Sequence, residues 1–182
     1  PRGGHAAEAE VVTQSAVQHP VMLQISERVS AKLTRDGAAE SLDIKGSFTL
    51  TVSTDEAGMC GVRMNLPRDS ASFTFNTHPK INKALFDKSN LLQLKDTTKG
   101  FPSARPVGIL RWSYNGSSED MVPIKINCWP EEESRGQMNV SIEYSVEVDI
   151  ELHNVQIVIP LGTSDSPHIL SEDGNYRHVA AN

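Results

Sequence analysis

The residues of this chain that could do chemistry are, first, four carboxylates in its C-terminal part: Glu143, Glu147, Asp149 and Glu151. Two carboxylates that face each other across a cleft can hydrolyse a glycosidic bond. These four, however, alternate with apolar residues, and alternate residues of an extended strand share one face. Acidic side chains in this pattern keep the outer face of a strand in water. We therefore favour a solvated strand face over a glycosidase site.

Other catalytic and metal-binding patterns are absent from the sequence. It has no Gly-x-Ser-x-Gly elbow, no His-Glu-x-x-His motif and no phosphate loop ending in Gly-Lys-Ser or Gly-Lys-Thr. The two cysteines are far apart, and the histidines do not stand at metal-ligand spacing. These histidines are His5, His19, His78, His153, His168 and His178. The sequence predicts no catalytic residue, no metal site and no cofactor.

A binding surface is predicted from residues 122–130, an apolar alternation that ends in Trp-Pro. In an extended strand, the side chains of Val122, Ile124, Ile126 and Cys128 would share a buried face. The opposite face would then present three candidate partner-binding residues: Lys125, Asn127 and Trp129. Tryptophan is common in protein interfaces, but it also seals the ends of sandwiches, so contact and packing both stay open for Trp129.

His78 and Trp112 are two further candidates, and each has a structural alternative. His78 precedes Pro79, which holds it in extended geometry. Its ring could bond a neighbouring backbone group and fix the entry into a helix, and we favour that role over ligand contact. Trp112 is in phase with Leu110, so sealing the sheet end is the favoured role for its indole.

Composition bounds the class of protein. The chain of 182 residues can bury a core, and its net charge of -6, from 17 basic and 23 acidic residues, argues against nucleic acid as the main partner. No apolar run approaches the roughly 20 residues that span a bilayer, and no signal pattern opens the chain, so we expect a cytosolic protein.

Cys60 and Cys128 are each in phase with apolar neighbours, which predicts buried free thiols, although a disulfide between them stays open.

Period-two patterns dominate the chain after residues 1–20, which read as a linker or tail. Strands are predicted over residues 21–33, with Glu27 as one polar interruption, and over 42–52, where Gly46 would mark a bulge. Further strands are predicted over residues 60–66, 73–75, 109–114, 122–129, 140–152 and 155–159. The strand over 122–129 is expected to pair with that over 109–114, and the strand over 155–159 is expected to be buried.

One or two short helical turns are predicted over residues 81–94, where Ile81, Leu85 and Phe86 have helical spacing and Leu91 and Leu92 follow. Many strands with short turns and almost no helix indicate an all-β fold, an antiparallel β-sandwich.

Several motifs follow one another in a specific order: Thr77-His78-Pro79, Ile81 to Phe86, Gly108 to Trp112, Ile126 to Pro130 and Asp173 to His178. In this order they resemble the mu-homology domain of the delta subunit of coatomer, the COPI vesicle coat, and the resemblance runs from about residue 21 to 178. The resemblance implies a sandwich of the adaptin medium chain type, with residues 21–154 as an incomplete first subdomain and 155–182 as the start of an inserted second one. Returning strands beyond Asn182 would then close an otherwise open sheet edge.

The same resemblance implies a non-enzymatic coat subunit that acts in Golgi-to-ER retrograde transport. Its implied partners are other coatomer subunits and tryptophan-containing peptides of tethering factors or Arf GTPase-activating proteins. Its implied location is the cytoplasm, the Golgi membrane and COPI-coated vesicles, with peripheral membrane association. In related clathrin adaptor chains an aspartate binds tyrosine signals, and Gln24 stands at that point here, so tyrosine-signal recognition is not expected.

Two alternatives stay open. One is a secreted carbohydrate-binding or carbohydrate-active β-sandwich, suggested by the acceptor patterns at Asn115 and Asn139 and by the acidic strand. The other is a scaffold segment that contacts only neighbouring coat subunits.

Overall fold

The structure, a computed structural model, describes residues 19–134, 136–146, 149, 151–172 and 174–179. The chain divides into two compact units, one ending at residue 148 and the other beginning at residue 149. All helices and strands that the structure describes belong to the first unit. The predicted linker over residues 1–20 lies outside the described residues, apart from His19 and Pro20.

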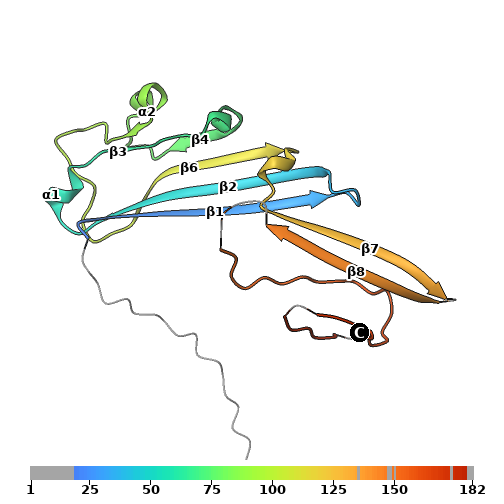
Figure 1. Cartoon of the computed structure of the whole chain (residues 1–182). Coiled ribbons are helices and arrows are strands. Elements are labelled where there is room, and N and C mark those ends of the chain that lie inside the picture. The colour runs from blue at the N-terminus through green and yellow to red at the C-terminus, as the bar shows by residue number, and fades with distance from the viewer. Residues whose placement is uncertain (1–18, 135, 147–148, 150, 173, 180–182) are drawn as a thin grey trace, which may run out of the picture. The chain divides into compact units, whose positions relative to one another are not determined.

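The first unit is built on an antiparallel sheet with the strand order β1-β2-β6-β4 (Figure 1). Its strands are β1 (Val21–Leu33), β2 (Ala39–Val52), β4 (Thr74–Thr77) and β6 (Val107–Gly116). Gly37, in the turn between β1 and β2, has a φ of 87°, which glycine adopts without steric cost. Two smaller antiparallel sheets pair β3 (Val62–Arg63) with β5 (Leu91–Leu92), and β7 (Ile124–Ser134) with β8 (Gln137–Val146). The prediction of an all-β antiparallel fold is confirmed.

Among the described residues, helical structure is limited to short segments. They are α1 (Asp55–Gly58), α2 (Lys83–Ser89) and two 3-10 turns, η1 (Arg68–Ser72) and η2 (Glu119–Met121). The predicted helix corresponds to α2, which begins where the Asn82 side chain accepts a hydrogen bond from the Leu85 N–H (3.1 Å). It ends at Asn90, whose left-handed φ of 54° redirects the chain. A second helical turn at Leu91 and Leu92 was the wrong alternative, because after this reversal they pair with β3.

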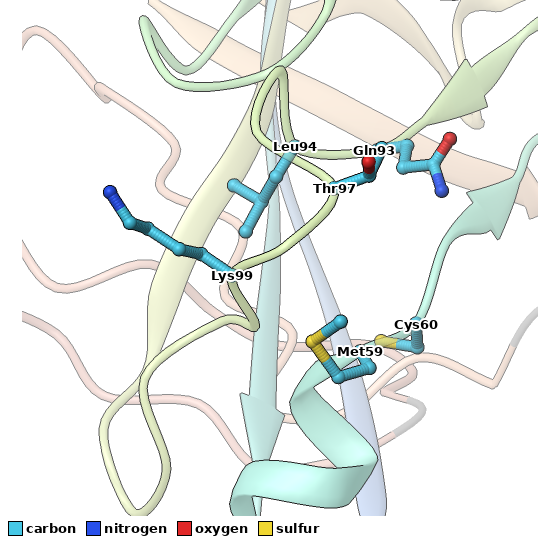
Figure 2. Close-up of a pocket in the computed structure, with 6 residues that line it drawn as sticks. All are labelled: Met59, Cys60, Gln93, Leu94, Thr97 and Lys99. Carbon is cyan, nitrogen blue, oxygen red and sulfur yellow. The ribbon is translucent and has the colours of Figure 1, made fainter.

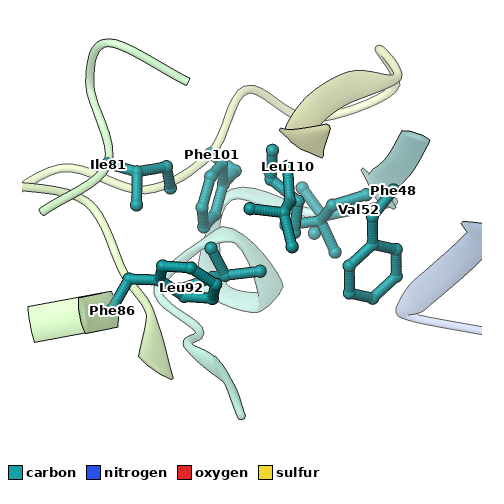
Figure 3. Close-up of a cluster of buried hydrophobic side chains, with 9 residues drawn as sticks. Phe48, Val52, Ile81, Phe86, Leu92, Phe101 and Leu110 are labelled. Carbon is teal, nitrogen blue, oxygen red and sulfur yellow. The ribbon is translucent and has the colours of Figure 1, made fainter. Parts of the chain in front are cut away.

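The hydrophobic core lies on one face of the large sheet. Alternate residues of β2 point into it, and they meet side chains from β5, β6, α2 and the loops (Figure 3). This main core consists of Phe48, Leu50, Val52, Ile81, Phe86, Leu92, Phe101, Ile109 and Leu110. A smaller cluster of Leu42, Ile44 and Val122 lies at the other end of β2. The period-two alternation of β2 thus predicted its buried face correctly.

A tryptophan and a glycine interlock on this sheet. Gly46 lies opposite Trp112 of β6 and Glu27 of β1 in register. The Trp112 ring crosses the β2 backbone at Gly46, where an added Cβ would lie 1.9 Å from its Cε2 atom. The indole N–H donates to a Glu27 carboxylate oxygen (2.6 Å). Gly46 therefore makes room for an indole and is not the predicted bulge; the register shift falls between Phe48 and Thr49.

Other predictions about strand neighbours and burial were wrong. β7 pairs with β8 and not with β6, because β2 and β4 already occupy both edges of β6. Within the part of the chain that the structure describes, no second layer covers the apolar side of the β7–β8 sheet, and Ile126 and Cys128 are exposed. The middle of the apolar side of β1 is likewise exposed, with Ile25 63% accessible, whereas Val21 and Leu33 at its ends pack against the core clusters. The strand predicted over residues 60–66 is reduced to β3.

The C-terminal predictions also need correction. β8 ends at Val146, whereas the alternation predicted a strand to residue 152; Glu147, Val148 and Ile150 lie outside the described residues. Residues 155–159 form no strand, and their apolar side chains are exposed, because no described segment pairs with them.

Replacing Leu110 by Ala should lower the free energy of unfolding by about 2–5 kcal/mol, because this 1% exposed side chain fills the main core. Urea unfolding followed by circular dichroism measures the change. Met22→Ala is the matched control on the same sheet: Met22 is 54% exposed, so its loss should change stability by less than about 0.5 kcal/mol. Equal losses in the two variants would contradict the assignment of the core.

Gly46→Ala should destabilise the protein by about 1–3 kcal/mol, because the added methyl group displaces the Trp112 indole. Gly108→Ala is the control, since nothing lies within 4 Å of a Cβ added at Gly108. Thermal unfolding compares both variants with Trp112→Ala and with the Gly46→Ala/Trp112→Ala double variant. The two substitutions should be strongly non-additive, and simple additivity would argue against the interlock.

The two thiols should differ in reactivity. Cys60 is partly buried and Cys128 is exposed, and both are free. Burial raises the pKa of the Cys60 thiol, which lowers its thiolate fraction at any given pH. A colorimetric thiol reagent should therefore show a fast phase that Cys128→Ser abolishes and a slower phase from Cys60. A fast phase that survives in Cys128→Ser would refute this difference.

Candidate functional site

The predicted binding residues Lys125, Asn127 and Trp129 lie on β7, on one face of the β7–β8 hairpin. Their cross-strand neighbours on β8 are Ser145, Glu143 and Ser141, in that order. All six residues are exposed, and Trp129 is 49% accessible. This hairpin face combines an ammonium group, an amide and an indole along one strand, which can donate hydrogen bonds and offer apolar area to a partner chain.

A surface depression of about 180 Å³ adjoins this face. Lys125, Ile126 and Asn127 line it from β7, and Leu33, Asp36 and Gly37 line it from the end of β1 and the following turn, together with Glu119. Ligand pockets usually measure roughly 300–1,000 Å³, so this depression fits one side chain of a partner and not a whole small ligand. Lys125 and Asn127 are thus brought together at a hollow, with Trp129 next along the same strand face.

His78 does not line this depression, and it makes structural contacts of the kind that its sequence context predicted. Its Nδ1 accepts a hydrogen bond from the Lys80 N–H (3.2 Å), and its carbonyl oxygen accepts one from the Ile81 N–H (2.8 Å). Its own N–H donates to the Ile109 carbonyl oxygen (3.0 Å). These bonds tie the start of the α2 segment to β6.

Trp112 is also engaged within the fold. Its ring is half-buried against the main core, lies over Gly46 and donates to Glu27. For Trp129, no described residue accepts a hydrogen bond from the indole. Trp112 therefore packs within the fold, the role that its phase with Leu110 favoured, whereas Trp129, for which contact and packing both stayed open, is exposed.

A second hollow lies beside α1, lined by Met59, Cys60, Gln93, Leu94, Thr97 and Lys99 (Figure 2). Its volume of about 20 Å³ holds about one water molecule, so it cannot take a ligand. Within the described ranges, no group of three or more His, Cys, Asp or Glu side chains could hold a metal ion. No helix in the same ranges has the length and apolar character of a membrane span.

Glu27 and the residues outside β7 that line the depression were not identified from the sequence. The sequence held one clue to the role of Glu27, because Glu27 interrupts the apolar side of β1. At that position its carboxylate accepts the hydrogen bond of the Trp112 indole. Leu33, Asp36, Gly37 and Glu119 gave none, since only the folded chain brings them beside β7. Of the four acidic residues considered first, Glu143 lies exposed on β8, Asp149 and Glu151 are exposed outside any strand, and Glu147 is outside the described residues.

Comparisons with known proteins identify the family. The model of the adaptor complexes medium subunit family matches residues 12–182. Coatomer subunit delta of Dictyostelium discoideum is 39% identical over 166 residues, which cover 91% of this chain and 30% of that protein. Coatomer subunit delta of Arabidopsis thaliana is 34% identical over 167 residues, 90% of this chain and 31% of that protein. The chain thus spans about a third of the length of these relatives.

Two solved structures are also similar. The yeast delta-COP-I mu-homology domain in complex with a Dsl1 WxWxV peptide has a TM-score of 0.61 and 26% identity, covering 70% of this chain and 51% of that one. The same yeast domain without the peptide has a TM-score of 0.61 and 28% identity, with equal coverage. The family model matches nearly the whole length of this chain. The chain therefore belongs to the adaptor complexes medium subunit family, and its fold is that of the delta-COP mu-homology domain.

Proposed function

We propose that this chain is a peptide-binding domain of a COPI coat subunit, which captures short tryptophan-containing peptides of partner proteins during Golgi-to-ER retrograde transport. The observation that carries the proposal is the yeast mu-homology domain solved with a WxWxV peptide, to which this chain is 26% identical. The identity of 39% to a coatomer delta subunit supports the assignment to a coat.

The exposed face of β7 suits a peptide of this kind. The two tryptophans and the valine of WxWxV occupy alternate positions, so an extended peptide presents all three on one face. One of these side chains would enter the depression at Lys125 and Asn127, while the Trp129 ring would pack against a neighbour. A single short peptide gives modest affinity, and many copies in a coat raise the overall strength by avidity.

Further parts of the proposal follow from the coatomer relatives. The partners would be other coatomer subunits, tethering factors and Arf GTPase-activating proteins, and the chain would act on the cytosolic face of the Golgi membrane and on COPI-coated vesicles. It would bind and not catalyse. Residues 21–154 would form the first subdomain, and residues 155–182 would begin an inserted second one.

The test is a titration of the chain with a labelled WxWxV peptide, followed by fluorescence anisotropy. Wild-type protein should bind saturably, and Trp129→Ala should raise the Kd by about tenfold or more, because a desolvated aromatic anchor is lost. Asn127→Ala should raise it less.

Tyr144→Ala is the matched control, because Tyr144 is an equally exposed aromatic residue (48%) on the opposite face of the same hairpin. Its Kd should stay within about twofold of the wild-type value. A peptide with both tryptophans replaced by alanine should not bind. Absence of saturable binding to wild-type protein would reject the function, whereas equal effects of Trp129→Ala and Tyr144→Ala would reject only the site.

A further inference from the structure

The face of the large sheet opposite the core has an unusual composition. Its residues come from alternate positions of four strands: Gln24, Ser26, Arg28, Ser30 and Lys32 of β1; Asp43, Lys45, Ser47 and Thr49 of β2; Arg111, Ser113 and Asn115 of β6; and Thr74 and Asn76 of β4. We call this set the polar face. None of these residues is buried. Four are basic and only Asp43 is acidic, in a chain whose net charge is -6.

Three of the basic residues are grouped at the centre of the polar face. Arg28 lies directly opposite Lys45, and Arg111 lies opposite Ser47, which is two residues along β2 from Lys45. Directly opposed residues have Cβ atoms about 4.5–5.5 Å apart, and diagonal neighbours are about 7–8 Å apart. Long arginine and lysine side chains at these spacings can reach a single anionic group together.

Internal acids only partly neutralise this group. The Lys45 ammonium lies 3.0 Å from an Asp43 carboxylate oxygen. The hydrogen bond from Lys45, followed by its charge, an Asn115 hydrogen bond and the Arg28 charge, lowers the pKa of Asp43, so Asp43 stays ionised. Lys32 pairs with Glu40 at the end of the sheet. Neither Arg28 nor Arg111 forms an ion pair with any residue that the structure describes.

Like charges directly opposite each other destabilise a sheet. The pair of Arg28 and Lys45 therefore opposes folding stability as far as Asp43 leaves it unneutralised, and an external anion would neutralise the remaining charge. Hydroxyl and amide groups surround the pair. Ser26 and Ser47 form the next pair on this face, two residues along each strand from Arg28 and Lys45. Ser113 lies opposite Lys45, and Asn76 lies opposite Arg111. Such groups donate hydrogen bonds to carboxylates.

We propose that the polar face binds an acidic segment of a partner protein, whose carboxylates contact Arg28, Lys45 and Arg111. This surface is distinct from the tryptophan-peptide site on β7 and does not depend on it. An anionic membrane is the less favoured occupant, because lipid-binding patches use clusters of about 4–8 basic residues and this group has three within a net acidic chain.

The experiment uses the intact chain and a fluorescein-labelled peptide of alternating glutamate and serine, which contains no tryptophan. The triple variant Arg28→Gln/Lys45→Gln/Arg111→Gln should weaken binding by about tenfold or more, and added salt should weaken binding of the wild-type protein. The matched control is Lys80→Gln/Lys88→Gln/Lys99→Gln, which removes the same charge from exposed lysines elsewhere. That control should change the Kd by less than about twofold.

Thermal unfolding shows whether the variants are folded. Arg28→Gln alone removes the like-charge opposition to Lys45, so its Tm should be equal to or higher than that of the wild type while its affinity for the acidic peptide falls. Sedimentation with vesicles of phosphatidylcholine, with and without phosphatidylserine, tests the membrane. The proposal is overturned if both triple variants bind the acidic peptide equally, if wild-type protein does not bind it, or if only the phosphatidylserine vesicles respond to the triple variant.

Discussion

Burial of one face of β2 is the constraint on which the rest of the first unit depends. Every second residue from Leu42 to Val52 is buried, and the two neighbours of β2, β1 and β6, are paired to it in antiparallel register. A slip of one residue would move this whole set of apolar side chains to the polar face. The register in turn places Trp112 over Gly46 and fixes which side chains of β1 and β6 share the polar face.

The same register separates two kinds of surface. On the core side, β2 and β6 are covered by α2, β5 and the loops, whereas Leu23, Ile25 and Val29 in the middle of β1 are exposed. The apolar side of the β7–β8 hairpin is exposed as well, including Ile126 and Tyr144. Contiguous exposed apolar side chains of this kind mark contact surfaces. The polar sides of the large sheet and of the hairpin carry the charges and amides that give a contact its specificity.

The candidate sites differ in how far the sequence could predict them. Alternation alone put Lys125, Asn127 and Trp129 on one face, because strand side chains alternate whatever the strand pairs with. It could not show that β8 is the partner of β7, since adjacent strands in sequence are not always adjacent in a sheet. Alternation also placed Cys128 in a core, and the structure shows it exposed. Alternation identifies the apolar face of a strand, but it says nothing of whether another layer covers that face.

By itself, then, the sequence determined the strands of the large sheet, a short helix within residues 81–94, the buried face of β2 and the polar character of one side of the large sheet, because these depend on local periodicity and side-chain type. Only the tertiary structure decided that Trp112 packs while Trp129 is exposed, that Arg28 and Lys45 stand opposite each other, and that Leu33 and Glu119 meet β7 at a depression. These outcomes depend on strand order and register. Contacts between residues far apart in the chain set both, and no local pattern records them.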